Sequence, residues 1–302
     1  MKSTSFQAES VGAPSDRRAS RFSDFSQLVK ARLTVLALIT TAVGFYLGEP
    51  GAVDPVGLLH VLIGSAFAAA GASALNQWWE KDLDAVMSRT SSRPVPSGRM
   101  RPLSVFVLGT VLSAAGVVYL ALATNFLAAS LAALTVLIYI FAYTPLKRRT
   151  TANTLVGAIP GALPPLIGWA AARGQLDGAA WSLFLILFIW QMPHFFAIAW
   201  LYRDDYDRAG FRMLSHEDES GSRSASQAVL FCILLLVIAG IPAFIGLNRP
   251  SYLLPELILG GGFVVAAMRF HGDGNIRNAR LLFFASIIYL PLLLIALVLT
   301  KL

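Results

Sequence analysis

Nine apolar segments, each long enough to cross a membrane, constrain this chain more than any other feature of its sequence. A helix of about 20 residues spans the hydrocarbon core of a bilayer. Windows of that length lie at 29–49, 55–78, 102–121, 124–143, 153–172, 180–202, 227–247, 252–270 and 279–299. Because backbone polar groups in lipid must be satisfied within the segment itself, the sequence predicts an all-α polytopic membrane protein with nine transmembrane helices.

The charged residues agree with this prediction because they are few and unevenly placed. Only 14% of the 302 residues are charged, against about a quarter in soluble domains. Of the 24 Lys and Arg residues, only Arg173, Arg249 and Lys301 lie on one side, so 21 share the other. Since positive residues mark the cytoplasmic side, we expect a cytoplasmic N-terminus. The basic residues are thus explained by the orientation of the protein in the membrane, and no nucleic-acid partner is predicted.

The chain divides into a short tail and one membrane domain. Residues 1–27 are polar and Ser-rich and lack the long apolar core of a signal peptide, which predicts a flexible cytoplasmic tail. No linker interrupts residues 28–302, so they are expected to form a single domain. The one cysteine, Cys232, lies in an apolar run and excludes an internal disulfide.

Acidic residues gather directly after the second and sixth apolar segments. In the first group, Asn76, Glu80 and Asp84 repeat every four residues. If the second helix continues past Trp79, this spacing keeps them within about 80° of one face. Side-chain oxygens placed in this way suit Mg2+, which usually binds one or two carboxylates together with water and substrate phosphate. For the neighbouring Asp82 we prefer a plain role as a solvated loop charge.

Basic residues follow these acids. Arg89 and Arg93 come next in the chain, and Lys147 and Arg148 lie in the following cytoplasmic loop. Acid-bound metal together with free cationic side chains is typical of a diphosphate site. For Lys147 and Arg148, a role in topology alone is an equal alternative. The sequence has no Ser or Cys placed beside a His, and no His cluster suited to zinc.

Four stretches, in order, resemble the UbiA superfamily of intramembrane prenyltransferases. The first is Asn76-x-x-x-Glu80-x-x-x-Asp84, continued by Met-x-Arg-Thr-x-x-Arg-Pro at 87–94, and the others are 143–171, 190–210 and 212–214. Their details are similar to the protohaem IX farnesyltransferase branch. The resemblance implies a UbiA-like bundle in the bacterial inner membrane, with its two Asp-rich regions facing each other at the cytoplasmic end.

The resemblance also implies a reaction. The farnesyl group of farnesyl diphosphate would be transferred, with Mg2+, to a vinyl group of haem B, giving haem O and diphosphate. A haem A synthase or oxidase assembly proteins are predicted partners. The nearer alternative is a UbiA-type enzyme with another aromatic or tetrapyrrole acceptor. A transporter is the rival of another class, but it would place ionisable residues near mid-bilayer, whereas these acids collect at one end.

Site roles follow from the resemblance and from the chemistry. Glu80 and Asp84 are predicted metal ligands, and Asn76 is expected to contact metal or phosphate. The second motif, Tyr202-x-x-Asp205-Tyr206, lacks an intact Asp-x-x-x-Asp, so Asp205 and then Asp204 are its predicted ligands. The predicted diphosphate-binding residues are Arg89, Arg93, Lys147 and Arg148. Trp79 and Tyr202 are candidates for stabilising an allylic cation, although aromatic residues at span ends are usually interfacial anchors.

His194 and a group of prolines stand out within the apolar segments. A polar ring inside a membrane needs a partner. His194 therefore either bonds between helices or acts on haem, as an iron ligand or as a base for water. We favour a role at the haem without assigning it. Pro160, Pro164 and Pro165 interrupt the fifth segment, which predicts a kink, or equally a widened pocket.

Overall fold

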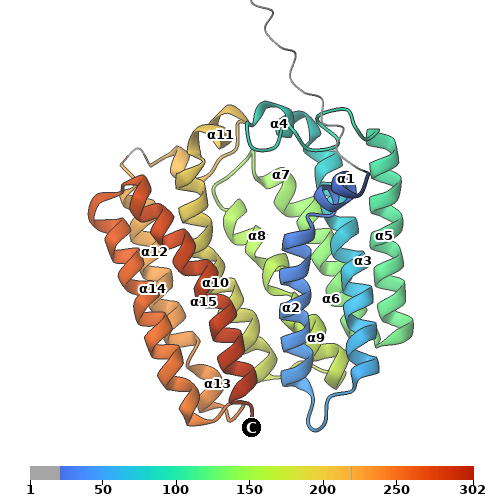
Figure 1. Ribbon diagram of the computed structural model, residues 1–302, viewed down its shortest axis with the longest axis vertical. Helices are drawn as coiled ribbons and strands as arrows, with labels where there is room; N and C mark the ends of the chain where they lie inside the picture. Colours follow the sequence, from blue (N-terminus) through green and yellow to red (C-terminus); the bar gives the residue numbers. More distant parts are fainter. Residues whose placement is uncertain (1–20, 219) are drawn as a thin grey trace, which may run out of the picture.

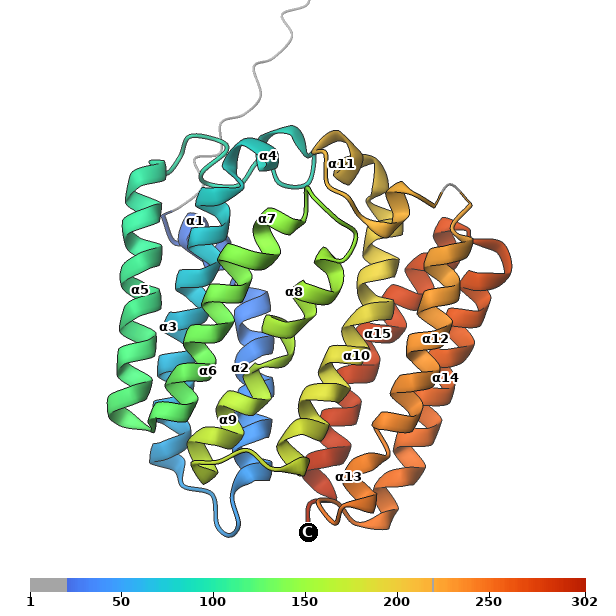
Figure 2. The ribbon, with the colours of Figure 1, turned by 180° about the vertical axis from the view of Figure 1, so that it is seen from behind.

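A computed structural model describes residues 21–218 and 220–302 of the chain, and these are mainly helical (Figures 1 and 2). The elements in chain order are α1 (Arg21–Leu28), α2 (Ala31–Gly48), α3 (Pro55–Trp79), α4 (Lys81–Val86), α5 (Pro102–Ala123), α6 (Phe126–Leu137), η1 (Ile138–Tyr143), α7 (Thr144–Leu146), α8 (Asn153–Ala162), α9 (Pro164–Arg173), α10 (Gly178–Leu201), α11 (Arg203–Arg208), η2 (Leu214–His216), α12 (Ser222–Ile238), α13 (Ile241–Phe244), η3 (Pro250–Tyr252), α14 (Leu253–Asp273) and α15 (Ile276–Leu299).

Within this described part, nine helical segments are long and apolar enough to cross a membrane. They are Ala31–Gly48, Pro55–Trp79, Pro102–Ala123, Phe126–Leu146, Asn153–Arg173, Gly178–Leu201, Ser222–Phe244, Pro250–Asp273 and Ile276–Leu299. The prediction of nine membrane helices is therefore confirmed. The clearest difference in bounds is in the seventh segment, where the helix begins at Ser222 rather than at 227. Hydropathy marks the stretch that lies in lipid, whereas a helix can extend beyond it into the polar interface.

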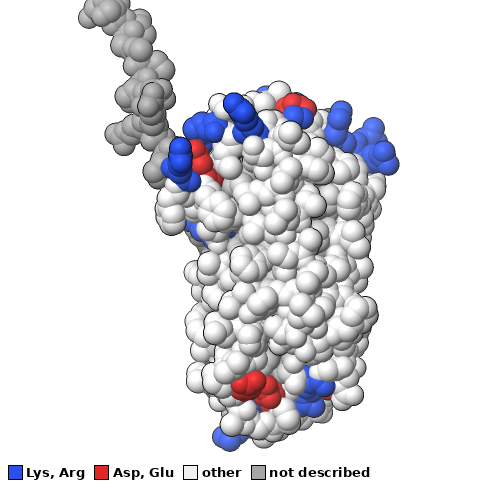
Figure 3. Space-filling model, turned by 90° about the vertical axis from the view of Figure 1, so that its right-hand side faces the viewer, with Lys and Arg blue, Asp and Glu red and all other residues white. Residues whose placement is uncertain are grey.

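The outer surface between the two ends of the bundle is apolar. Figure 3 shows Lys, Arg, Asp and Glu gathered toward the ends of one face, with a broad uncharged band between them. Large apolar side chains are exposed to a high degree: Leu122 is 83% exposed and Phe126 is 80% exposed. An exposed apolar surface of this extent is unfavourable in water but suits the hydrocarbon core of a bilayer. The chain is thus a multi-pass membrane protein.

The membrane helices form two groups. α3 packs against α5, and α2 packs against α9, whereas α10, α12, α14 and α15 pack against one another. Both ribbon views show α8 between the two groups, and α4 and α11 together at one end of the molecule (Figures 1 and 2). At the opposite end, Lys301 Nζ donates to the carbonyls of Tyr46 (2.6 Å) and Glu49 (2.7 Å). This contact ties the end of α15 to the end of α2.

Helix α1 corrects the predicted boundary of the N-terminal tail. Leu28 is fully buried, and the Gln77 side chain donates to the carbonyls of Gln27 (2.7 Å) and Leu28 (2.9 Å). Residues 21–27 therefore belong to the folded bundle and not to a flexible tail, because the buried Gln77 amide requires these acceptors. The remainder of the tail predicted over 1–27, namely residues 1–20, lies outside the described residues.

The fourth and fifth membrane spans are interrupted along their length. The fourth span passes from α6 into the π-helical turn Ile138–Tyr143, just before Pro145, which has no backbone N–H to donate. The fifth span breaks between α8 and α9 at Leu163, directly before Pro164. The predicted kink in the fifth span is thus confirmed.

Replacing Gly71 with alanine is expected to lower the thermal stability of the bundle. A Cβ at Gly71 on α3 would lie 2.3 Å from Ser113 Oγ and 2.6 Å from the Gly109 carbonyl of α5. Overpacking of this kind costs about 1–3 kcal/mol. Gly262→Ala on α14 is the matched control, because nothing lies within 4 Å of its added Cβ. Thermal unfolding in detergent should show a loss for Gly71→Ala only, and an equal loss in both variants would contradict the close packing of α3 on α5.

Candidate active site

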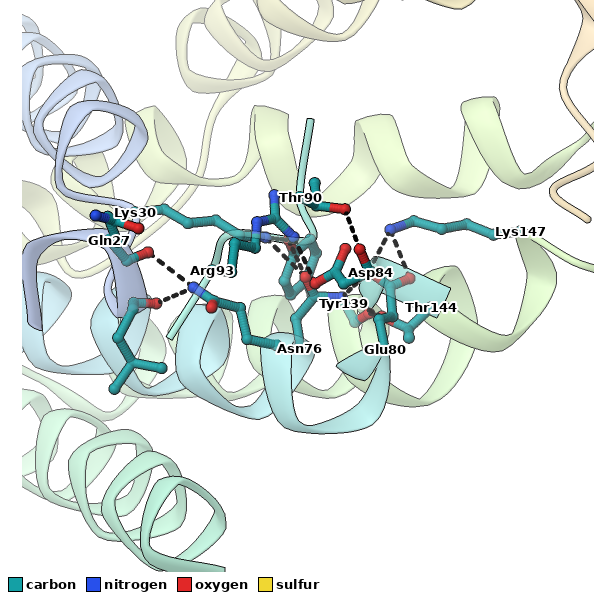
Figure 4. Close-up of polar contacts among 12 residues, drawn as sticks. Gln27, Lys30, Asn76, Glu80, Asp84, Thr90, Arg93, Tyr139, Thr144 and Lys147 are labelled. Carbon is teal, nitrogen blue, oxygen red and sulfur yellow. Dashed lines mark hydrogen bonds and ion pairs between the residues drawn. The ribbon is translucent and has the colours of Figure 1, made fainter. Parts of the chain in front are cut away.

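The first acidic motif lies where α3 ends and α4 begins (Figure 4). The helix stops at Trp79 and does not continue as a regular helix through the motif. Nevertheless, Glu80 N donates to the Asn76 carbonyl (2.9 Å), and Asp84 N donates to the Glu80 carbonyl (2.7 Å). These bonds keep a helical pitch across the break. Asn76, Glu80 and Asp84 are all buried, so the structure brings the three residues together as their spacing predicted.

Lys147 forms a buried ion pair with Glu80. Its Nζ lies 2.7 Å and 3.0 Å from the two carboxylate oxygens. Asn76 Nδ2 donates to Glu80 Oε2 (3.0 Å) and to Thr144 Oγ1 (3.1 Å), which fixes the carboxylate from the other side. Thr144 in turn donates to the Tyr139 carbonyl (2.8 Å) in the π-helical turn. The irregular turn therefore helps to position the partners of Glu80.

The charge of Lys147 is stabilised by its surroundings. Burial by itself would lower the pKa of this ammonium group, but the adjacent Glu80 carboxylate outweighs that effect and holds the pKa above its usual value. Lys147 Nζ also lies 4.5 Å from the centre of the Tyr143 ring. Lys147 is thus a buried, positively charged group beside an acid.

Arg93 makes the second ion pair of the site. Arg93 NH1 lies 2.7 Å from Asp84 Oδ2, and both groups are largely shielded from solvent. Thr90 Oγ1 donates to the Asp84 carbonyl (2.9 Å), so the loop after α4 folds back over the acid. Figure 4 shows Arg93 and Lys147 reaching the acidic residues from opposite sides. Each carboxylate of the motif is therefore matched by one cation.

Lys30 is a member of the site that the sequence-based reasoning missed. Its Nζ donates to Asn76 Oδ1 (2.7 Å) and to the Tyr139 hydroxyl (3.1 Å). Burial, reinforced by the positive charges of Arg93 and Lys147, lowers the pKa of Lys30 to about 7. In the sequence, Lys30 is only one of the 21 bases on the predicted cytoplasmic side. The sequence did contain one indication of this role. Lys30 directly precedes an apolar segment, so its charge lies at the membrane boundary, as do the acidic residues of the site.

The second acidic region contributes one buried carboxylate. Ser88 Oγ donates to the carboxylate of Asp205 on α11 and lies 2.8 Å and 2.9 Å from its two oxygens, and Asp205 is also paired with Arg208. The bond from Ser88, followed by the charge of Arg208, lowers the pKa of Asp205. The α4 loop and α11 are thus joined directly, as the predicted facing of the two motifs requires. Asp204, in contrast, has a side chain that is 85% exposed and lies 3.6 Å from Arg203, away from this cluster.

Three other predicted site residues lie at the surface. The Arg89 guanidinium sits 5.4 Å from the centre of the Tyr202 ring, and Tyr202 is 42% exposed. Arg148 is exposed and takes no part in the buried ion pairs. Of the two neighbouring bases Lys147 and Arg148, the structure therefore brings only Lys147 into the cluster.

An apolar cavity of about 340 Å³ begins at this polar cluster. Lys30, Tyr139 and Tyr143 line its polar end, and small or apolar residues of α2, α3, α6, α8, α9 and α10 line the rest. Leu33, which also lines it, is 64% exposed, so the cavity reaches the lipid-facing surface beside α2. An ionic head and an apolar tail can bind here together.

His194 lines the same cavity from α10. Its Nδ1 lies 2.7 Å from Ser286 Oγ on α15, so the ring is held by a hydrogen bond between helices. Of the aromatic residues that line the cavity, Tyr143 lies 4.5 Å from Lys147 Nζ and Tyr139 accepts a hydrogen bond from Lys30. The cation-stabilising role predicted for Tyr202 is therefore better suited to these two cavity-lining rings.

The donor set at the polar end fits a hard divalent cation. Among residues 21–218 and 220–302, no three His, Cys, Asp or Glu side chains form a ready metal cage. Glu80 and Asp84 are nevertheless both buried at the end of α3 and in α4, with the Asn76 amide on Glu80, and Mg2+ typically takes one or two carboxylates and completes its shell with water and phosphate. A site that is completed by the substrate needs no full protein cage.

Together these features define the class of the protein. Its helical fold, with an ionic cluster at the head of an apolar cavity, suits a membrane enzyme whose substrate has a charged head and an apolar chain. The chain belongs to the UbiA prenyltransferase family, which matches residues 37–288. This membership confirms the predicted family and excludes the transporter alternative.

Similar proteins and solved structures indicate which members of the family this chain resembles. A protein named "Protoheme IX farnesyltransferase" from Solibacter usitatus (strain Ellin6076) is 43% identical over 279 residues, which cover 89% of this chain and 96% of that protein. Solved structures share the fold. A digeranylgeranylglyceryl phosphate synthase has a TM-score of 0.78 at 18% identity and covers 92% of this chain and 98% of its own. A UbiA homologue from Archaeoglobus fulgidus bound to GPP and Mg2+ has a TM-score of 0.64 at 14% identity and covers 91% and 99%.

Proposed function

We propose that this protein transfers the farnesyl group of farnesyl diphosphate to a vinyl group of haem B, forming haem O and diphosphate. The observation that carries the proposal is the pair of buried ion pairs, Glu80 with Lys147 and Asp84 with Arg93, at the head of an apolar cavity. A prenyl diphosphate has the matching chemistry of an anionic head and an apolar chain. The named activity of the similar Solibacter protein supports haem as the acceptor.

The diphosphate would be held by exchange of ionic partners. In the described structure, Lys147 and Arg93 neutralise the two carboxylates. An arriving diphosphate offers these cations phosphate oxygens, to which Lys and Arg bind strongly. Lys30 stands at the same end of the cavity, and a bound diphosphate would favour its protonated form and so make it a third positive group. Arg89 and Arg148, which are exposed, would attract the negatively charged diphosphate toward the site.

The carboxylates released in this exchange would hold Mg2+. Glu80 and Asp84, with the amide oxygen of Asn76, are the proposed ligands, and Asp205 is the proposed contribution from the second motif. When bound, Mg2+ supplies positive charge that neutralises the diphosphate as a leaving group. The Archaeoglobus homologue bound to GPP and Mg2+ supports this proposal. Asp204 is left out because its side chain is exposed.

The cavity wall would protect the reactive carbon. When the bond from the allylic carbon to the diphosphate oxygen breaks, the electron pair leaves with the diphosphate. The rings of Tyr139 and Tyr143 can stabilise the positive charge, and the apolar wall excludes water. The allylic carbon then bonds to the terminal vinyl carbon of haem B. Water adds to the neighbouring carbon and loses a proton, which leaves the hydroxyethylfarnesyl group of haem O.

The proposal is tested by product analysis. Membranes containing the protein are incubated with haem B, farnesyl diphosphate and Mg2+, and the extracted haems are identified by mass. Haem O is the expected product. Parallel incubations with other aromatic and tetrapyrrole acceptors test the nearer alternative. Prenylation of one of these acceptors without haem O, by folded protein, would overturn the assignment of haem.

Removal of divalent metal should abolish turnover. With a chelator in excess over Mg2+, we expect haem O formation to fall by about 100-fold or more, because the diphosphate leaves without its neutralising charge. Added Mg2+ should restore the rate, and Na+ at equal ionic strength should not. Undiminished activity in chelator would contradict the proposed role of Glu80 and Asp84.

We further propose that the protein lies in a bacterial inner membrane with the ion-pair end in the cytoplasm. In a Cys232→Ser background, a cysteine at Ser91 near the site or at Gly51 at the opposite end can be labelled with a reagent that does not cross membranes. Label applied from outside should reach position 51 only, and labelling of position 91 would reverse the topology. Binding of a haem A synthase or of oxidase assembly proteins stays a prediction.

A further inference from the structure

Three contacts fix the ring of His194 within the sixth membrane span. Nδ1 lies 2.7 Å from Ser286 Oγ on α15. The ring stacks between Trp190, with centroids 5.3 Å apart and planes at 19°, and Phe283, with centroids 5.2 Å apart and planes at 23°. Trp190 Nε1 also donates to the Ser286 carbonyl (2.9 Å), which braces the partner residue. The imidazole is thus held in one orientation before any ligand binds.

The hydrogen bonds determine which ring nitrogen carries the proton. Ser286 Oγ has a single proton, and it donates that proton to the Phe283 carbonyl (2.5 Å). With its proton directed at that carbonyl, the hydroxyl oxygen accepts from His194, and on this basis we assign the ring proton to Nδ1. In the neutral ring, the lone pair then lies on Nε2.

Nε2 has no hydrogen-bond partner among the described residues, although His194 lines the apolar cavity. A hydrogen bond between α10 and α15 needs Nδ1 alone, so a purely structural role leaves the second nitrogen unexplained. An acceptor without a partner at membrane depth is unfavourable. The arrangement therefore calls for a ligand that accepts an electron pair from Nε2.

We propose that His194 Nε2 is the axial ligand of the iron of the haem substrate. This inference rests on the proposed function. Histidines that bind metals usually donate their other ring N–H to a neighbouring acceptor, which fixes the tautomer and the orientation, and Ser286 plays that part here. His194 lies seven residues before Leu201, the end of α10, or about 10 Å deeper at the helical rise. Ligation there would hold the macrocycle below the ion pairs.

The surroundings favour a ligand over a general base. A base must become an imidazolium ion, and such a charge is normally stabilised by a carboxylate at the other nitrogen. The partner of His194 is a neutral hydroxyl, and its ring is stacked on Trp190 and Phe283. A neutral imidazole that donates an electron pair to iron needs no such charge. His194 is accordingly a positioning group that orients one vinyl group toward the allylic carbon.

The test uses the full chain, purified in detergent and loaded with haem B in the ferrous state. Resonance Raman spectroscopy should show an iron–histidine stretching band in the unaltered protein. His194→Asn keeps a side-chain amide that can donate to Ser286 but removes Nε2, so the band should be lost and should return when imidazole is added. Ser286→Ala keeps the ring but removes its acceptor, so the band should shift to lower frequency.

Kinetics provide a second readout. In His194→Asn, the KM for haem B should rise about tenfold, while the KM for farnesyl diphosphate stays unchanged. His60→Asn is the matched control, because His60 bonds to Tyr119 on α5 (2.8 Å) and lies outside the cavity lining; its spectrum and kinetics should match those of the unaltered protein.

Two results would overturn the assignment of His194 as the iron ligand. The iron–histidine band could be missing from the unaltered protein, or it could persist unchanged in both His194→Asn and Ser286→Ala. Haem O formation by the unaltered protein is measured separately. If haem O forms but the predicted band is missing, His194 is not the iron ligand, although the proposed enzymatic activity stands. If no haem O forms, the proposed function itself is refuted.

Discussion

Asp84→Asn is expected to reduce haem O formation by about 100-fold, the effect typical of losing one charge-stabilising group in a catalytic site. The substitution keeps the size of the side chain but removes its charge. It therefore breaks the pairing with Arg93 (2.7 Å) and weakens the proposed hold on Mg2+. The measurement is the initial rate of haem O formation under saturating substrates, together with the Mg2+ concentration that gives half the maximal rate, which should rise.

Asp82→Asn is the control for this variant. Asp82 lies two residues away on the same short helix, but its side chain is 85% exposed and is paired only with Lys81. Its rate should stay within about twofold of the unaltered protein, because exposed ion pairs contribute little. Equal losses in both variants would show that the acidic loop acts through its overall charge, and would refute a specific role for the buried carboxylate.

Lys147→Met should lower the rate by about 100-fold and should also destabilise the protein. Lys147 supplies the proposed positive group nearest to Glu80, at 2.7 Å, so its loss removes stabilisation of the leaving diphosphate. It also leaves the Glu80 carboxylate buried without its cation, and breaking a buried pair in this way costs about 3–5 kcal/mol. Rates are measured well below the melting temperature of the variant, so that loss of activity and loss of folding are separated.

Arg148→Met is the matched substitution at the next residue. Arg148 carries the same charge in the same loop but is exposed. If the loop bases serve only membrane topology, both substitutions should have similar small effects on the rate. A large loss for Lys147→Met alone is the outcome that the structure leads us to expect, and near-normal activity of Lys147→Met would rule out its proposed contact with diphosphate.

Much of the fold could be predicted because hydropathy is a local property. Each membrane helix must satisfy its own backbone in lipid, so its length and position can be recognised without its neighbours. Helix starts were less predictable. The seventh helix begins at Ser222 because a helix can project past the apolar region. The polar helix α1 was mistaken for tail because contacts with distant residues hold it, namely those of Gln77 and Arg99.

The candidate site was predictable in part for a similar reason. The four-residue spacing of Asn76, Glu80 and Asp84 correctly placed them together, even though α3 ends at Trp79, since local backbone hydrogen bonds continue the pitch. The partners of these residues could not be predicted in this way. Lys147 is 67 residues from Glu80 in the chain, and no local pattern distinguishes it from Arg148.

The sequence by itself determined the nine membrane spans, the polar end and the residue types of an ionic site, because these depend on composition and spacing along single helices. Only the tertiary structure decided that Lys30 joins the site, that Asp204 does not, and that Ser286 lies against Nδ1 of His194. The physical reason is that burial, ion pairing and tautomer depend on groups brought from distant segments. Helix packing alone sets those contacts.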